Sequence, residues 1–312
     1  MSHHLKLIFF IAAIFTTSVV LSQTKREILE EDPKQAANLR LDISPLNLYA
    51  ADPNNAGMWS VRGSYRANNK FAISGEFRKE YYDDQEQIIN SGGNYSYLTP
   101  FKGSAYEIMG TYFFKSSEKE GSEWIPVKKK QISHNTIEVT VDPVPITKLT
   151  LYGVRAGYGS LKGTNSFLST TLTEVTNPSN KITASSIPLQ TTNTIFGGLS
   201  ATKIKNIKVR YPSYGVRRKQ VIREFYADFM YVASNTFSTV AGDGTTYSVD
   251  KSSPMLNYGF RAGILSSPHG RILNVGYGIE VGTFPGSESL SSYYLNFKLI
   301  LSLFKKVGPS TE

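Results

Sequence analysis

The sequence predicts an all-β protein: a transmembrane antiparallel up-and-down β-barrel of about ten strands, with twelve as the alternative count. Side chains between residues 257 and 304 alternate with a period of two, which is the period of a β-strand. One parity is aromatic and aliphatic, whereas the other holds glycine, amides and charge. This pattern is expected where one face meets lipid and the other lines a crowded lumen. No segment after Ser22 is long and apolar enough for a spanning helix, so a membrane protein with this chain has to be a closed barrel.

The chain begins with a segment typical of a secretory signal peptide. Lys6 precedes an apolar run that ends at Phe15, and small residues follow up to Ser22. We expect residues 1–22 to be a signal peptide cleaved after Ser22 rather than a transmembrane anchor, because the apolar run is barely long enough to span a bilayer. The chain has no Cys, so export does not imply a disulfide framework.

Behind the signal peptide, the sequence divides into three parts. Residues 23–36 are charged and predict a short lead-in, residues 37–304 predict the barrel, and residues 305–312 form a tail. Within the barrel, Pro45 is expected to interrupt or bend the first strand. Asn68-Asn69 predicts a tight hairpin, because Asn tolerates positive φ. The strand candidates cover residues 39–43, 59–66, 71–81, 105–115, 147–158, 194–210, 221–235, 257–265, 273–282 and 293–304.

Residues 116–146 do not show the alternation. They are charged and contain Pro126, Pro143 and Pro145. We expect either an excursion outside the barrel or one more hairpin, and the hairpin would raise the count to twelve strands. The connections without predicted strands cover residues 50–56, 83–104, 159–193, 236–254 and 284–291 at one end, and 68–69, 116–146, 211–220 and 266–270 at the other.

The polar parity predicts a lumen in which positive and negative charges balance. Buried charges persist when they are paired or hydrogen-bonded, and a barrel of about ten strands is narrow enough for side chains to fill much of it. We therefore expect a salt-bridged plug. The alternative is a narrow polar channel lined by the same residues, without selectivity for either ion sign. The predicted lumen charge network consists of Arg62, Arg66, Glu76, Arg78, Glu80, Glu107, Arg155, Glu224, Asp228, Arg261, Glu280 and Lys298.

Composition and motifs argue against several functional classes. The formal net charge is +9, but the basic residues are scattered among strand candidates, so we expect no nucleic-acid partner. Outside the signal peptide the histidines are His134 and His269, and no spacing suggests a hydrolase triad. Absent Cys and scattered His give no metal site of the zinc kind, and no glycine-rich phosphate loop precedes a helix. We expect neither an enzyme nor a cofactor.

The signal peptide, the glycine- and aromatic-rich strands and the terminal run Tyr293–Phe304 resemble Gram-negative outer-membrane β-barrel proteins. The resemblance implies the outer membrane of a Gram-negative bacterium, periplasmic termini, short periplasmic turns and longer outer loops. All the long polar loops except 116–146 then fall outside. In such proteins the last strand commonly ends on an outward-facing aromatic residue. Phe304 falls out of phase with the apolar face, so this signal is absent or a bulge lies near the end of the strand.

Two functional classes agree with these features. The first is a structural or interaction subunit of an envelope complex, which binds lipid around the barrel and other envelope proteins through the outer loops or the periplasmic segment 116–146. The second is a passive narrow channel for small solutes. A soluble exported β-sandwich is a third alternative, since sandwich strands also alternate.

Overall fold

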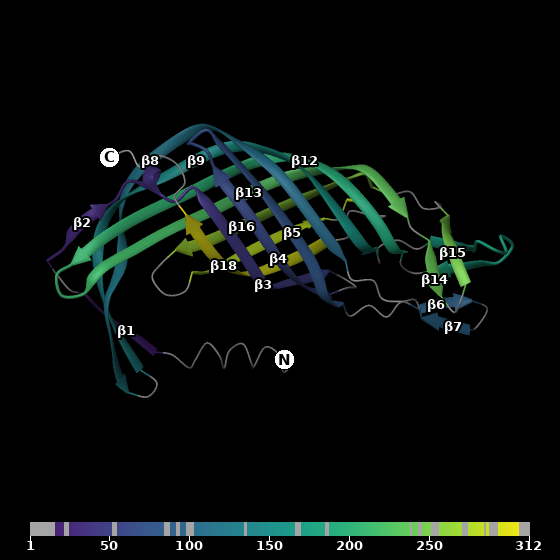
Figure 1. The fold of residues 1–312 in the computed structure, drawn as a ribbon, viewed down its shortest axis with the longest axis horizontal. Helices are drawn as coiled ribbons and strands as arrows, with labels where there is room; N and C mark the ends of the chain where they lie inside the picture. The colour runs from purple at the N-terminus through teal and green to yellow at the C-terminus, as the bar shows by residue number, and fades with distance from the viewer. Residues whose placement is uncertain are drawn as a thin grey trace.

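The computed structural model is a closed antiparallel β-barrel (Figure 1). Ten of the strands in the described part of the chain form its wall, and the pairing of β9 with β12 closes it. The wall strands are β3 (Leu39–Ala51), β4 (Asn55–Arg66), β5 (Phe71–Asp83), β8 (Ser104–Ser133), β9 (Thr136–Asn165), β12 (Ile187–Tyr211), β13 (Gly215–Phe237), β16 (Tyr258–His269), β17 (Val275–Thr283) and β18 (Tyr293–Lys305). The structure describes residues 16–21, 25–51, 55–83, 88–91, 94–97, 103–133, 136–165, 170–184, 187–237, 239–242, 245–250, 256–269, 274–283, 285–286 and 293–305.

The wall turns its apolar parity outward and its polar parity inward. On β17, Ile279 is 40% exposed whereas the next residue, Glu280, is 4% exposed. On β18, Leu295 is 48% exposed and Asn296 is fully buried. A water-soluble sandwich has the opposite arrangement, because its interior is the apolar face. The predicted barrel is therefore confirmed, and the sandwich alternative is wrong. No helix in the described residues is long and apolar enough to cross a membrane.

Pro45 lies in a β-bulge on β3. Relative to each neighbouring strand, β3 carries one extra residue, which lies between Ser44 and Asn47 opposite β4 and between Ile43 and Leu46 opposite β18. A bulge leaves a residue outside the regular hydrogen-bond ladder, so proline can occupy this position without breaking the strand. The first strand is therefore continuous. The last strand alternates regularly to its end, and Phe304 is half-buried on the inward parity, so the bulge expected near the end of this strand is absent from it.

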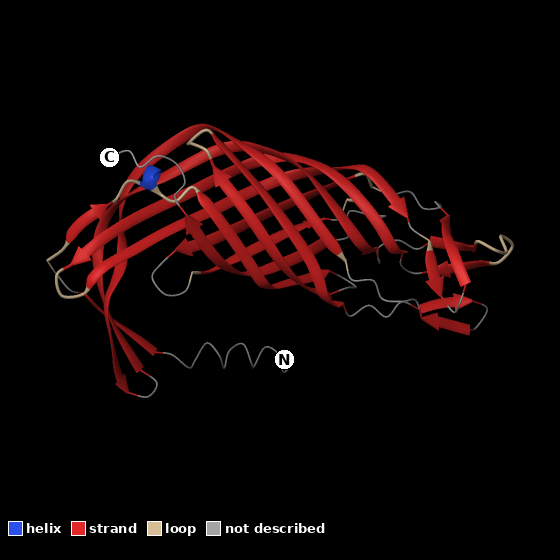
Figure 2. Ribbon diagram, viewed as in Figure 1, coloured by secondary structure: helices blue, strands red, loops and turns tan. Residues whose placement is uncertain are grey.

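The barrel strands differ in length, and the longest ones continue beyond one end. Leu39 pairs with Lys305, so we call the end with these residues the inner end. There, β8 and β9 pair continuously as far as Ser133 and Thr136, and β12 and β13 as far as Tyr211 and Gly215 (Figure 2). We call the described parts of residues 116–147 and 206–219 the inner extension. The segment 116–146 thus lengthens two wall strands and adds no further hairpin, and the count of twelve wall strands is wrong.

The inner extension has a hydrophobic core of its own. Its members come from β8, β9 and β12, and Tyr214 of the β12–β13 turn packs against them. Next to this core, the side chain of Asp142 is 1% exposed and accepts hydrogen bonds from Arg26 and from the core residue Tyr211. The extension is therefore a packed structure. The core residues are Ile125, Val127, Val144, Ile146, Ile207, Val209 and Tyr211.

Glu123 offers a test of this packing by pH. It receives ion pairs from Lys205 and Lys219, each at 2.6 Å. Burial opposes ionisation, but the hydrogen bonds from these lysines hold the pKa of Glu123 below its ordinary value. The ion pairs of Glu123 therefore stabilise the extension fully at any pH above the ordinary pKa of a glutamate. This stabilisation is lost as the pH falls through the lowered pKa of Glu123. Glu123→Gln should loosen the extension at neutral pH and weaken its response to acid, measured by the fluorescence of Trp124.

The fluorescence measurement uses a Trp59→Phe background, so that Trp124 is the only tryptophan. Glu120→Gln is the matched control, because Glu120 is exposed on the same strand. Equal acid responses of the Glu123→Gln and Glu120→Gln variants would contradict a role for the Glu123 ion pairs.

Segments near the N-terminus lie against the inner end. β1 (Thr16–Leu21) pairs in parallel with β9, and β2 (Glu27–Glu30) pairs with β12. Cleavage after Ser22, which stays a prediction, would remove β1 and leave β2. A 3-10 helix, η1 (Pro33–Gln35), follows. Behind it, Ala36 packs on buried side chains of the barrel, and the Ala37 amide donates to Gln220 Oε1 at 3.2 Å. The lead-in therefore covers part of the inner mouth.

Polar connections at the outer end contain a second sheet. It pairs short strands from three of the predicted loops in the order β14-β15-β10-β11-β6-β7. The expectation of loops without strands at residues 83–104, 159–193 and 236–254 is therefore wrong in part. The strands are β6 (Ile88–Ser91), β7 (Asn94–Tyr97), β10 (Thr170–Glu174), β11 (Lys181–Ala184), β14 (Val240–Gly242) and β15 (Thr245–Asp250).

Candidate functional site: the lumen charge network

The inward parity of the wall strands brings most of the predicted charged residues into one network. Seven of the described charged side chains form a continuous chain, which we call the ion-pair belt. Each contact joins a cation to an anion at 2.5–3.0 Å. In order, the belt consists of Lys298, Glu76, Arg78, Glu107, Arg261, Asp228 and Arg155.

The belt crosses the lumen rather than following the wall. Arg261 on β16 donates from Nη1 to both carboxylate oxygens of Glu107 on β8, at 2.8 and 2.9 Å. Between these two strands run β13, β12 and β9. Lys298 on β18 reaches Glu76 on β5 at 2.5 Å, past β3 and β4. Side chains from distant strands thus meet inside the barrel and obstruct it.

A second cluster lies beside the belt. Glu224 on β13 accepts one bond from Arg40 on β3 and one from Arg62 on β4, both at 2.6 Å. Arg40 also pairs with Asp42 at 2.9 Å, and Asp42 accepts from the Ser302 hydroxyl at 2.6 Å. Arg40, Asp42 and Arg62 are each at most 6% exposed. This cluster adds another bridge across the lumen, from β13 to β3 and β4.

Aromatic rings complete the filling around the belt. Tyr226 donates its hydroxyl proton to Glu280, and Tyr294 does so at 3.1 Å. The guanidinium of Arg155 lies 4.0 Å from the Tyr226 ring centroid, and that of Arg261 lies 4.3 Å from the Phe196 centroid. Such cation–π contacts are strongest where water is excluded. The belt is therefore held by packing as well as by charge.

Glycine on the inward parity gives these rings their space. A Cβ atom at Gly263 would lie 2.5 Å from the Tyr226 hydroxyl oxygen, and one at Gly282 would lie 2.8 Å from the Tyr294 ring. Both distances are shorter than van der Waals contact. The glycines of the polar face are thus a packing requirement of a crowded lumen.

Two residues of the predicted network lie outside these clusters. Glu80 accepts a bond from the backbone amide of Gly103, toward the outer end. Arg66 makes no ion pair with any residue that the structure describes. Conversely, sequence reasoning missed Arg40 and Asp42, although both stand on the polar parity of the first strand. Their position on the polar parity of this strand is the signal that could have identified them.

The chemistry of this site is electrostatic. Six carboxylates of the described residues belong to these clusters, and each has a cation or a tyrosine hydroxyl as its partner. In the described residues, no group of three or more His, Asp or Glu side chains is placed to hold a metal ion. The carboxylates are Asp42, Glu76, Glu107, Glu224, Asp228 and Glu280.

Comparison with known proteins gives little. No family model and no curated protein matches the chain. Among solved structures, in-vitro folded OmpT, an outer membrane protein of Vibrio cholerae, shares 12% identity and a TM-score of 0.18 over 89% of this chain and 100% of that one. Its trimer form has 10% identity and a TM-score of 0.16, with 91% and 100% covered. These similarities are too weak to assign a family or a function.

Proposed function

We propose that this protein is an integral outer-membrane β-barrel with a closed lumen that serves as a structural or interaction subunit of an envelope complex. The observation that carries the proposal is the ion-pair belt, which joins strands on opposite sides of the barrel. Buried ion pairs with good geometry are costly to separate, so the belt resists the opening that a solute pore requires. The lead-in at the inner mouth adds to the obstruction.

The surfaces beyond the membrane supply the interaction role. At the inner end, the extension presents Trp124, which is 49% exposed, and the exposed Lys128 and Lys130. Exposed aromatic side chains are enriched where proteins bind one another, and the two lysines favour a partner whose surface is acidic. At the outer end, the six-stranded sheet gives the loops a defined shape. A barrel built to pass solutes needs neither of these structures.

Conductance across a planar lipid bilayer tests the closed lumen. The purified full chain should insert without stable, reproducible current steps, because the belt leaves no continuous aqueous path. Steps of constant size in the unmodified protein would sink this proposal and favour the narrow channel.

Affinity isolation from detergent-solubilised membranes tests the interaction role. A matched variant lacks residues 129–139 and joins Lys128 to Thr140, which are cross-strand partners, through an Asn-Gly turn. The deletion leaves the core of the inner extension in place. Proteins that dock on the removed part of the extension, which includes Lys130, should copurify with the intact chain and be lost with the variant. Identical sets of copurifying proteins would exclude this part of the extension as the docking surface.

A further inference from the structure

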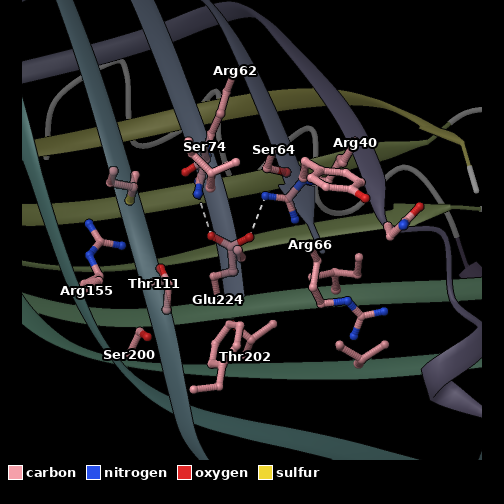
Figure 3. Close-up of a pocket in the computed structure, with 18 of the residues that line it drawn as sticks. Arg40, Arg62, Ser64, Arg66, Ser74, Thr111, Arg155, Ser200, Thr202 and Glu224 are labelled. Carbon is pink, nitrogen blue, oxygen red and sulfur yellow. Dashed lines mark hydrogen bonds and ion pairs between the residues drawn. The ribbon is translucent and has the colours of Figure 1, made fainter. Parts of the chain in front are cut away.

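A small cavity lies in the inner half of the lumen, beside Glu224. Its volume is about 60 Å³, and since one water needs roughly 10–15 Å³ by this measure, it has room for about four to six. Ala37 and Asn38, which lie between the lead-in and β3, are among the residues that line it. Figure 3 shows Arg62 and Arg40 bonded to Glu224, with Arg66 and Arg155 on either side.

Positive charge exceeds negative charge around this cavity. Among the described residues that line it are the four arginines of Figure 3 and a single carboxylate, Glu224. Two further carboxylates pair with these arginines: Asp42 with Arg40, and Asp228 with Arg155. They raise the number of anions to three, and Asp228 also pairs with Arg261. At least one positive charge is thus uncompensated. It belongs to Arg66, the one of the four without an ion pair in the described part of the chain.

Hydrogen-bond donors in the cavity wall are also left over. Arg62 Nε, Arg155 Nε, Arg66 Nη1 and Ser200 Oγ are buried and have no hydrogen-bond partner among the described residues. Arg62 and Arg155 are 6% and 5% exposed as whole residues. Buried donors are nearly always satisfied in native proteins, and an unpaired one costs free energy. Four such donors on residues that line one void favour an occupant with several acceptor oxygens.

We propose that this cavity binds one small, freely diffusing oxyanion of the phosphate or sulfate class. A guanidinium presents donors in a fork that matches such an anion, and the anion's charge compensates the surplus on Arg66. Water would satisfy donors but would leave that charge unbalanced. The hydroxyls of Thr111 and Thr202, which also line the cavity, supply further donors. The size of the void admits an anion of about five heavy atoms and excludes larger solutes.

Equilibrium binding of inorganic phosphate to the detergent-solubilised full chain, free of phospholipid, tests the proposal. The unmodified protein should bind one phosphate per chain saturably, and phosphate should raise its melting temperature. Arg66→Gln should weaken binding by about tenfold or more, as expected for loss of a charge-assisted hydrogen bond. Ser200→Ala, a milder change, should weaken it several-fold. Arg210→Gln removes an equal charge at a position that is 55% exposed, outside the lumen, and should leave binding unchanged.

Three outcomes would overturn the proposal. They are no saturable binding at millimolar phosphate, equal binding by Arg66→Gln and Arg210→Gln, or binding that appears only when phospholipid is added, which would assign the phosphate to a lipid headgroup. Melting of each variant without phosphate shows whether it folds. The assay has no bilayer and measures no current, so its failure bears on the cavity and leaves the closed-lumen proposal standing.

Discussion

Replacing Arg261 with alanine should destabilise the barrel by about 3–5 kcal/mol, the usual effect of removing one partner from a buried ion pair. Asp228, whose side chain is fully buried, would keep only Arg155, and Glu107 would lose its bidentate partner. Glu107 would keep Arg78, so each carboxylate would be left with one cation. Water would enter beside them, and the belt would break between Glu107 and Asp228. We expect a lower melting temperature and measurable ion conductance across a planar bilayer where the unmodified protein shows little.

Two comparisons make the Arg261 result specific. Arg261→Lys keeps the charge but loses the fork, so it should fall between the unmodified protein and the alanine variant. Arg210→Ala breaks an exposed pair with Glu27, which is worth about 0–1 kcal/mol, and should change neither melting nor conductance. If the unmodified protein already conducts freely and Arg261→Ala alters only its ion preference, the belt lines a working pore.

An arginine on the outward face should impair assembly by a different mechanism. Ile279 is 40% exposed near the middle of β17, so Ile279→Arg would place a charge in lipid at a cost of roughly 2–4 kcal/mol near the bilayer midplane. Val275→Arg, at the start of the same strand, should cost less because the penalty falls toward the interface. The fraction of protein in outer membranes that migrates as the folded species before boiling measures both effects.

Val175→Arg is the matched control for the lipid-face variants. Val175 is 53% exposed in the second sheet region, just after β10, so the same change there puts the charge in water. It should assemble like the unmodified protein. Normal assembly of Ile279→Arg would mean that this face of the barrel does not contact hydrocarbon.

The alternation of apolar and polar side chains made it possible to predict the wall strands and most of the residues of the lumen network. A period of two assigns each side chain to a face, so Arg261 and Asp228 could be placed in the lumen from the sequence. Their partners could not be predicted, because the meeting of Arg261 with Glu107 depends on how ten strands close and how far each is shifted. Arg66 shows the same limit: parity places it inside, but only the register shows that it has no carboxylate opposite.

The inner extension escaped prediction for a local reason. Pro126, Pro143 and Pro145 are unfavourable in the middle of a sheet, because proline cannot donate to the ladder. In the extension, however, β8 has left β5 and β9 has left β12, so the prolines can occupy edges that need no donor. The second sheet was missed because strands such as β10 and β15 pair across a large separation in sequence.

The seam between β3 and β18 sets the order in which this protein can fold. Leu41 pairs with Leu303, so the first and the last wall strand meet across 262 residues of the chain. Contacts of such high sequence separation form slowly, since loop-closure entropy has to be overcome first. Until the last strand arrives, β3 carries an unpaired edge that invites pairing with another chain. Loss of β18 (Tyr293–Lys305) would therefore leave β3 and β17 each with an unpaired edge, and the whole cylinder would be open.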